Sequence, residues 1–384
     1  MPVRPLPYDD AGADLLAEDL AWLGDGVEWF DAHTHIGHND PDGYEADPHE
    51  LIEALDVAGQ QRALVFAMHE PDGYAEANRW VLESCAASGG RLEALVRVDP
   101  KSPDALEEAE RGLDAGARGI KLHPRSDAFG LPHPTVERLV EMVSERRLAV
   151  LIHAGRGIPH LGDTVLDLAA EHPGARLILA HAGISDLGLL GPRVARYPNV
   201  LFDTSWWNAA DLLSLLVMVP PGQIVYASDM PYGGPRYAAL ALLRCARAVG
   251  LSREQVAVMV GAQLDRVVTG QELIELGDAP GPAALGPRVP GLERAAGYLT
   301  AAIQMTFRGG DPTEPLALAR LACQVSGEPE HAAALRKVDA LVALAQQRLE
   351  ETGDPYPAVH AALAAQIVAA TAPAPALGPS AINV

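Results

Sequence analysis

Residues 30–35 read Phe-Asp-Ala-His-Thr-His, and three later segments also carry a metal-binding type of side chain at the expected end of a strand. These segments are Leu151-Ile152-His153-Ala154-Gly155, Leu179-Ala180-His181-Ala182-Gly183 and Tyr226-Ala227-Ser228-Asp229. All three follow short apolar runs typical of buried parallel strands, whereas the first segment is mixed but still strand-like. We therefore expect three strand ends to deliver imidazoles, and a fourth to deliver a carboxylate, to one convergent metal site.

The spacing of His33 and His35 favours a shared ligand role. Side chains on a strand alternate with a period of two, so both imidazoles should point to one side and Thr34 to the other. Two such rings can reach one ion at a Zn–N distance of roughly 2.0–2.1 Å. Taken alone, the pair could equally be two histidines that form hydrogen bonds in a polar loop. Only the four segments taken together favour the metal site.

The order of strand-like and helical segments predicts a (β/α)8 TIM barrel. The strand-like runs lie at residues 27–32, 62–67, 92–98, 117–122, 147–152, 175–180, 199–204 and 223–228. Amphipathic helical patterns lie between them, so each unit is about one strand and one helix. Barrels of this kind place active sites at the carboxyl ends of the strands. The alternative, an open doubly wound sheet, would typically place a glycine-rich turn after the first strand, where this chain has histidines.

We assign residues 27–276 to the barrel. The segments outside it differ from it in composition and in hydrophobic pattern. Residues 1–26 predict a leading helical segment, and residues 277–290 form a linker rich in Pro, Gly and Ala. Residues 291–370 predict an all-helical region, and residues 371–384 an extended tail. The predicted helices span 290–307, 313–325, 328–351 and 356–370. We expect this region to dock on the barrel, beside the pocket mouth or at a homodimer interface, although a self-contained tethered bundle is the alternative.

The composition narrows the class of partner. The chain has 384 residues, 48% of them hydrophobic, a formal net charge of -22 and a pI of about 4.9. Such a surface repels phosphate backbones and anionic lipids, so we expect a small-molecule substrate and neither nucleic acid nor a membrane. Three widely separated cysteines and an acidic N-terminal segment without an apolar stretch indicate a cytoplasmic protein.

The ordered motifs resemble a known family. The motifs are His33-x-His35, Lys121-Leu122-His123-Pro124, His153-Ala-Gly, His181-Ala-Gly and Ser228-Asp229-Met230-Pro231. Together they resemble the amidohydrolase superfamily, and within it the amidohydrolase-2 group of metal-dependent hydrolases and decarboxylases. The resemblance covers about residues 27–270 and implies a distorted TIM barrel with a divalent metal at its mouth. One departure is Gly261-Ala262-Gln263, where family members often have Gly-Asn-Ala.

The resemblance also implies roles for single residues. His33, His35 and His153 would be metal ligands, and Asp229 would bind the metal or contact its water. His181 would be either a ligand of a second metal or an electrophilic and proton-transferring residue. The implied cofactor is a divalent cation, with Zn²⁺ favoured, as one ion or two.

The same residues indicate a mechanism. A cation held this way would activate a water for attack, with Asp229 accepting its proton and His181 polarising a carbonyl. Asp229 could alternatively be a helix N-cap ahead of Met230-Pro231, since Asp is favoured there.

Lys121 ends the fourth predicted strand, and its role stays open. A buried lysine is costly unless it is paired or modified. The alternatives are a carbamylated lysine bridging two metals, as in two-metal relatives, a protonated lysine that binds a substrate carboxylate, and a lysine paired with an acid.

Five further residues are candidates for substrate binding because they follow strand ends. They are His69, His123, Arg125, Arg156 and Trp206. The arginines suit planar carboxylates, and the tryptophan could form a wall of the pocket, but surface arginine is an equally good interpretation of Arg125 and Arg156.

Three hypotheses about function follow. The first is a metal-dependent hydrolase that uses a metal-activated water to cleave a small amide, ester or lactone. The second is a non-oxidative decarboxylase or hydratase of a small carboxylated substrate. The third is a non-catalytic barrel used as a binding scaffold, against which the intact set of ligand-type residues argues.

Overall fold

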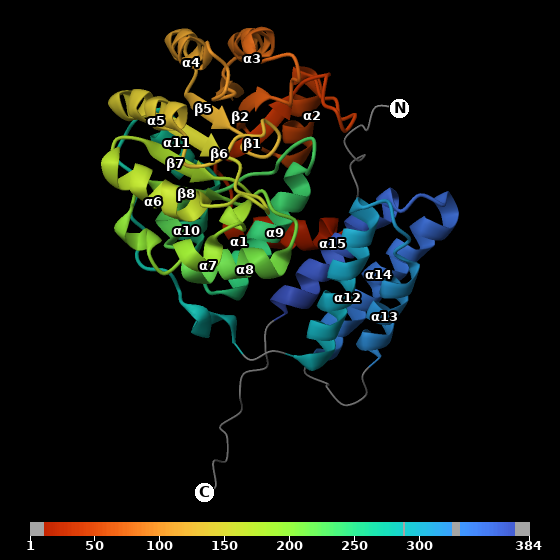
Figure 1. Ribbon diagram of the computed structural model, residues 1–384. Helices are drawn as coiled ribbons and strands as arrows, with labels where there is room; N and C mark the ends of the chain where they lie inside the picture. The colour runs from red at the N-terminus through yellow and green to blue at the C-terminus, as the bar shows by residue number, and fades with distance from the viewer. Residues whose placement is uncertain (1–10, 287–288, 325–330, 373–384) are drawn as a thin grey trace, which may run out of the picture.

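The chain folds into a parallel barrel with a helical region at one side (Figure 1). The computed structural model describes residues 11–286, 289–324 and 331–372. The strands are β1 (Phe30–Ile36), β2 (Arg62–Ala67), β3 (Leu92–Ala94), β4 (Val96–Arg97), β5 (Gly119–Leu122), β6 (Ala149–Ile152), β7 (Arg176–Leu179), β8 (Val200–Asp203) and β9 (Ile224–Val225). β3 and β4 are two halves of the third predicted strand, interrupted at Leu95, so the predicted TIM-barrel fold is confirmed.

Backbone hydrogen bonds close the sheet into a barrel. The ladders β1-β2-β3 and β4-β5-β6-β7-β8-β9 are parallel throughout. Leu95 N donates to Val65 O at 2.9 Å and joins the two ladders. On the other side, Ala32 N donates to Tyr226 O at 2.9 Å and His35 N to Met230 O at 2.8 Å. These bonds tie the first strand to the last and exclude an open sheet.

The barrel interior is filled by side chains and is no pore. Its apolar cluster comprises Phe30, Ala32, Leu64, Phe66, Leu95, Ala149, Leu151, Ile178, Ala180, Leu201, Val225, Ala227, Leu264, Val267 and Val268. The last three come from α11 (Gln263–Val268) and close the amino-terminal end of the barrel. The polar ends of the strands are therefore left at the opposite, carboxyl-terminal face.

Helices surround the barrel and bury its outer face. They are α2 (Pro48–Ala58), α3 (Ala75–Ala87), α4 (Ala105–Asp114), α5 (Pro134–Arg146), α6 (Leu161–Glu171), α7 (Leu187–Leu190), α8 (Ala209–Met218), α9 (Pro235–Ala248) and α10 (Arg253–Ala257). α2 begins with a capping box, in which Asp47 accepts from the backbone of Glu50 and the Glu50 side chain accepts from Asp47 N.

Gly261 explains how the last turn of the barrel packs. Gly261 lies in the helical segment η4 (Val258–Ala262). A Cβ at this position would lie 2.0 Å from Glu28 O, so only glycine permits this segment to approach the chain before β1. Gln263, where this sequence departs from the family pattern, is fully buried. Its side chain accepts a hydrogen bond from Ile274 N at 2.9 Å and donates to Gly222 O.

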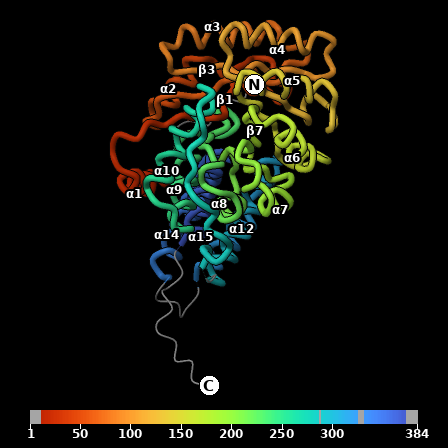
Figure 2. The backbone as a smooth tube through the Cα atoms, turned by 90° about the vertical axis from the view of Figure 1, so that its left-hand side faces the viewer, coloured from red at the N-terminus to blue at the C-terminus, as the bar shows by residue number. Residues whose placement is uncertain are grey.

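The C-terminal helices form one unit that contacts the barrel. They are α12 (Pro290–Phe307), α13 (Thr313–Cys323), α14 (Ala332–Thr352) and α15 (Tyr356–Thr371). The unit lies on the side of the molecule opposite α3 and α4 (Figures 1 and 2). α15 is rich in alanine and packs on α12 and α14 on one side and on α8 and α9 on the other. It is thus buried nearly all round, and the expected docking on the barrel is observed.

Polar contacts reinforce this docking. Gln366 accepts a hydrogen bond from Ala209 N at 3.4 Å and donates to Thr300 Oγ1 at 2.8 Å, so it links α8 to α12. Lys337 pairs with Asp14 of α1 (Ala13–Leu23) at 2.5 Å. The buried side chain of Asp19, also on α1, pairs with Arg244 and Arg247 of α9. Both terminal segments of the described chain are therefore anchored to the same flank of the barrel.

Several predicted segments extend beyond the described residues. Residues 1–10 of the leading segment and 373–384 of the tail lie outside them. The same holds for 287–288 of the linker, for residue 325 and for the start of the helix predicted from 328. Among the helices that the structure describes, none has the length and apolar character needed to cross a bilayer.

A chain truncated after Gly277 should lose stability. Removal of α15 uncovers the apolar faces of α8 and α9, and we expect the Tm to fall by about 10 °C or more. Thermal unfolding followed by circular dichroism measures this. A chain ending at Ala372 is the matched control and should unfold like the full chain. A soluble barrel of unchanged Tm after the longer truncation would contradict the prediction.

Candidate metal centre

Three potential ligand atoms meet at the carboxyl-terminal mouth of the barrel. His33 Nε2 lies 3.2 Å from His35 Nε2, and Asp229 Oδ1 lies 3.2 Å from each of these nitrogens. Both imidazoles are buried, whereas 21% of the Asp229 side chain is exposed. The sequence predicted that these three residues would converge, and the structure brings them together.

An irregularity in β1 aims the histidines inward. The register of β1 against β2 shifts between Asp31 and Thr34. Ala32 already belongs to the barrel interior, so the shift lets His33 face inward as well. Thr34 points the other way and donates to Leu64 O at 2.6 Å. The expected alternation of His33, Thr34 and His35 therefore holds in the strand end that carries the ligands.

The two strand ends that supply the ligands are bonded to each other. Asp31 Oδ1 accepts from His33 N and from Ser228 N, each at 3.0 Å. Asp229 has a left-handed backbone with φ of 62°, a conformation that Asp adopts more readily than most residues. The N-cap of α9 is Gly234, so Asp229 does not serve as the N-cap of that helix.

Asp203 at the end of β8 fixes the orientation of His33. Its Oδ2 lies 2.7 Å from His33 Nδ1, and its Oδ1 accepts from His181 N at 2.9 Å and from Ser205 Oγ at 2.5 Å. A proton on His33 Nδ1 leaves the lone pair of Nε2 directed at His35 and Asp229. Such outer partners of metal-binding histidines fix their tautomer. The sequence interpretation assigned no role to Asp203.

The donor set fits a divalent metal ion. Two imidazole nitrogens and a carboxylate oxygen are typical ligands of zinc and similar ions. Ligand atoms about 2.1 Å from a common ion can lie 3.2 Å apart, as these three do. Electron-rich atoms turned toward one another are stabilised by a cation between them. The buried group of His33, His35 and Asp229 is therefore consistent with a metal site.

Burial sets the protonation of these groups. It lowers the pKa of His33 and His35 well below the ordinary value, and the nearby Lys121 ammonium acts in the same direction. Both rings are therefore neutral at pH 7, which is the form that binds metals. Burial raises the pKa of Asp229, and Lys121 opposes that shift. A bound cation would favour the ionised carboxylate.

His181 and His153 form a second pair beside the three ligand atoms. His181 Nε2 lies 2.9 Å from His153 Nδ1, and His181 Nδ1 donates to Ser205 O at 2.8 Å. His181 Nδ1 lies 3.9 Å from Asp229 Oδ2. Of the four expected ligands, His153 is the one outside the tight group, and it connects to the site through His181.

Lys121 is fully buried at the end of β5. Its Nζ has no hydrogen-bond partner among the described residues and lies 4.7 Å from the centre of the Phe66 ring. Burial, with a contribution from Arg97, lowers its pKa to about 7. Of the three interpretations of Lys121, the pairing with an acid is not observed within the described chain.

Comparisons with known proteins identify the family. The family model described as Amidohydrolase matches residues 28–261, which is more than half of the chain. The chain belongs to the amidohydrolase family. The match ends before α12, so the four C-terminal helices of the chain lie outside it. No curated protein matches the sequence.

Solved structures share the barrel. An uncharacterised TIM-barrel protein from Bordetella bronchiseptica matches with 12% identity and a TM-score of 0.53, over 64% of this chain and 99% of that one. An amidohydrolase from Burkholderia multivorans matches with 16% identity and a TM-score of 0.51, over 63% and 99%. A 5-carboxyvanillate decarboxylase from Sphingomonas paucimobilis matches with 14% identity and a TM-score of 0.48, over 63% and 99%. Likeness at this level concerns the fold.

Three of the other candidate residues lie near the pair formed by His153 and His181. The His123 ring stacks on His153 with centroids 3.9 Å apart. Trp206 is half-buried, with its ring 6.1 Å from that of His181, and the Arg156 guanidinium lies 5.6 Å from the Trp206 ring. Arg125 is exposed in the loop after β5.

His69 belongs to a separate polar cluster. Its Nε2 lies 4.0 Å from Asp127 Oδ1, which also accepts from Tyr74 at 2.5 Å and pairs with Arg97 at 3.2 Å. Arg97 is almost completely buried and ends β4. The sequence interpretation missed Arg97, although its position at a strand end was the signal used for the other residues.

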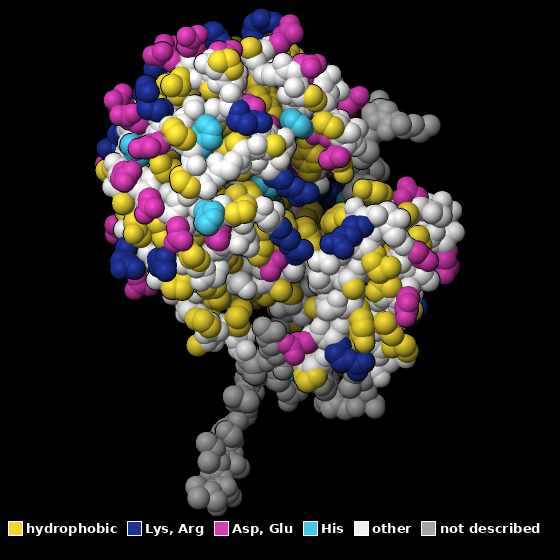
Figure 3. Space-filling model, viewed as in Figure 1, with side chains coloured by type: hydrophobic (Ala, Val, Ile, Leu, Met, Phe, Trp, Pro, Cys, Tyr) yellow, Lys and Arg dark blue, Asp and Glu magenta, His cyan; other side chains and the backbone are white. Residues whose placement is uncertain are grey.

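The molecule is hollowed between the barrel and the helical region (Figure 3). Apolar side chains line this hollow, and Lys and Arg side chains lie around it. This arrangement contrasts with the net charge of -22 of the whole chain.

Proposed function

We propose that this chain is a metal-dependent hydrolase that cleaves a small amide, ester or lactone, with Zn²⁺ as the favoured ion. The observation that carries the proposal is the mutual 3.2 Å spacing of His33 Nε2, His35 Nε2 and Asp229 Oδ1. These atoms lie at the end of a barrel where enzymes of this fold place their chemistry. Membership of the amidohydrolase family supports the same class.

The proposed roles follow from the positions of the side chains. His33, His35 and Asp229 would hold the ion, and Asp203 would keep His33 in the metal-binding tautomer. A divalent ion at this point supplies a Lewis acid and lowers the pKa of a water. Asp229 has a second oxygen and partial exposure, so it can accept a proton and return it to the leaving group.

His181 is proposed as the residue that faces the reacting carbonyl. Ser205 O accepts the proton of its Nδ1, and Asp203 holds its backbone N. Ser205 therefore holds the ring and Asp203 the backbone, so the residue needs little rearrangement during reaction. Its Nε2 contacts His153 Nδ1, so a proton can pass between the two rings.

Arg156 supports a second candidate, a non-oxidative decarboxylase or hydratase of a small carboxylated substrate. The guanidinium is exposed, lies over Trp206 and forms no ion pair with any residue that the structure describes. An arginine held against a flat ring suits a planar carboxylate.

Metal analysis and a substrate panel test the proposal. The purified protein should contain close to one equivalent of a divalent metal, or two if Lys121 is carbamylated. It should release product from at least one amide, ester or lactone, and chelation should abolish this rate. Turnover only of aromatic carboxylates, with loss of CO₂, would select the second candidate. Protein without metal would favour a binding scaffold.

A further inference from the structure

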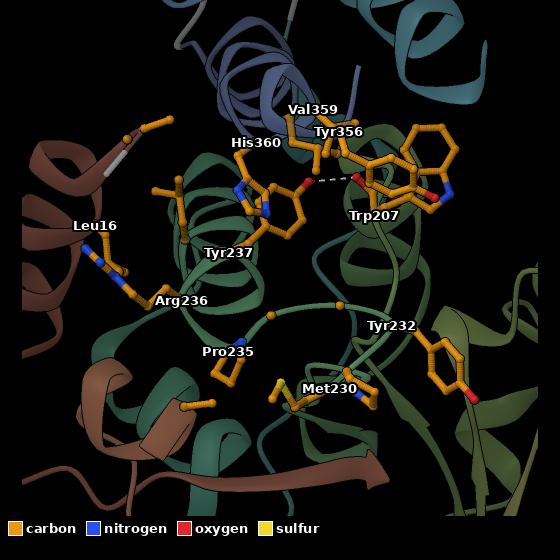
Figure 4. Close-up of a pocket in the computed structure, with 18 of the residues that line it drawn as sticks. Leu16, Trp207, Met230, Tyr232, Pro235, Arg236, Tyr237, Tyr356, Val359 and His360 are labelled. Carbon is orange, nitrogen blue, oxygen red and sulfur yellow. Dashed lines mark hydrogen bonds between the residues drawn. The ribbon is translucent and has the colours of Figure 1, made fainter. Parts of the chain in front are cut away.

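A cavity separates the loop after β9 from the C-terminal helices (Figure 4). It lies between loop 230–235 and α9 of the barrel, the start of α1, α2, and α15. Its volume is about 540 Å³. Pockets for small organic ligands have volumes of roughly 300–1,000 Å³.

Two glycines of the loop before α9 help to form the cavity. The cavity is partly open to solvent, so a small ligand can enter it. Gly233 and Gly234 line it and contribute no side chain. A Cβ at Gly234 would meet no atom within 4 Å, although the backbone there has an ordinary extended conformation.

The lining is mainly apolar and aromatic. Tyr237 and Val359 face Met230 and Pro235 across the space (Figure 4). Trp207 and Phe307 contribute two more aromatic rings, whose centroids are 5.9 Å apart in an edge-to-face arrangement. Such surfaces bind flat rings through burial and edge or face contacts.

Several polar groups of the lining are already engaged within the protein. The Tyr237 hydroxyl donates to Trp207 O at 2.8 Å, as the dashed line in Figure 4 marks. Glu50 is used in the capping box of α2. Arg236 and His360 each interact with another group of the protein. Glu50, Glu53 and Asp354 also line the cavity beside Arg236, so an anionic ligand would lose its water and meet mainly carboxylates.

We propose that this cavity is a binding site for an uncharged aromatic compound of one or two rings. His33, His35 and Asp229 are not part of its lining, so the cavity lies beside the metal group and does not include its ligand atoms. The proposal therefore stands whether or not the metal centre is hydrolytic. One wall comes from α15, which lies outside the amidohydrolase match.

The site adjoins the metal group through one segment. Loop 230–235 begins directly after Asp229. Tyr232, which belongs to the lining, also places its ring 5.1 Å from that of His35. A ligand in the cavity would thus contact the segment that holds Asp229.

Calorimetric titration of the full-length protein with indole tests the proposal, with indole-3-acetate as the charged counterpart. Wild type should bind one indole saturably and bind indole-3-acetate at least tenfold more weakly. Gly234→Leu and Val359→Phe, which fill the cavity from opposite walls, should each weaken indole at least tenfold. Gly297→Leu makes the same change on an exposed face of α12, where a Cβ also meets nothing, and should stay within about twofold of wild type.

Four results of the titrations above would each overturn the proposal. They are no saturable indole binding, indole binding that survives both filling variants, preference for indole-3-acetate, and an equal loss in Gly297→Leu. A chain lacking residues 1–10 that binds indole at least tenfold more tightly than the full chain would assign the cavity to that segment instead. Thermal unfolding of each variant establishes that the protein titrated is folded.

Discussion

Replacement of His33 by alanine should remove the metal and the activity together. His33 provides one of the three atoms of the proposed site, and its other nitrogen is held by Asp203. Without the ring, two ligand atoms remain at the mouth, too few for a typical protein site. We expect metal affinity to fall by more than the 10–100-fold that loss of an outer-shell partner costs. Metal content after gel filtration, measured beside the rate on the best substrate of the panel, checks this.

Two further variants test whether the loss of metal is specific to the ligand His33. Asp203→Asn keeps the ligand but alters the group that accepts from His33 Nδ1, so we expect a loss of about 10–100-fold in metal affinity. His49→Ala removes an exposed histidine on α2 and should change neither quantity. If His33→Ala retains full metal occupancy, the assignment of the site is wrong.

The barrel could be predicted because its signals are local. The apolar runs at 62–67, 147–152 and 175–180 contain or coincide with β2, β6 and β7. Each strand is buried on both faces, so its sequence is a continuous apolar run that ends where the backbone leaves the core. The side chain just after that end necessarily lies at the mouth. The convergence of His33, His35 and Asp229 follows from strand order and closure alone.

The side-chain contacts within the site could not be predicted in the same way. Whether His153 turns toward His33 or toward His181 depends on χ angles and on competing partners such as the His123 ring. Asp203 went unassigned because an aspartate at a strand end fits several roles equally well. Only its 2.7 Å contact with His33 Nδ1 distinguishes the orienting role.

In the helical region, too, the helices could be predicted from the sequence, whereas their packing could not. Its four helices lie close to the predicted ranges because caps, glycines and prolines are local signals. The surface that α15 covers could not be derived, because an alanine-rich helix offers small side chains on every face. Its contact with α8 and α9 depends on the shapes of both partners.

Replacement of His181 by asparagine should separate catalysis from metal binding. His181 has φ of 57°, a left-handed conformation that asparagine tolerates better than most residues, so the backbone should be retained. With one ion in the site, metal content should stay near the wild-type value, because His33, His35 and Asp229 are untouched. Turnover should fall by about 10²–10⁴-fold, the usual contribution of a positioned proton-transfer group.

His160→Asn is the matched control for this change. His160 is exposed and has φ of 60°, so the same substitution is made in the same backbone conformation away from the site. It should leave the rate and the metal content unchanged. If His181→Asn instead loses one of two bound ions, His181 is a ligand of a second metal, and Lys121, buried without a partner in the described chain, becomes the candidate bridge between the two. If His181→Asn retains both its metal and its full rate, the residue only supports the loop through its backbone contact to Asp203.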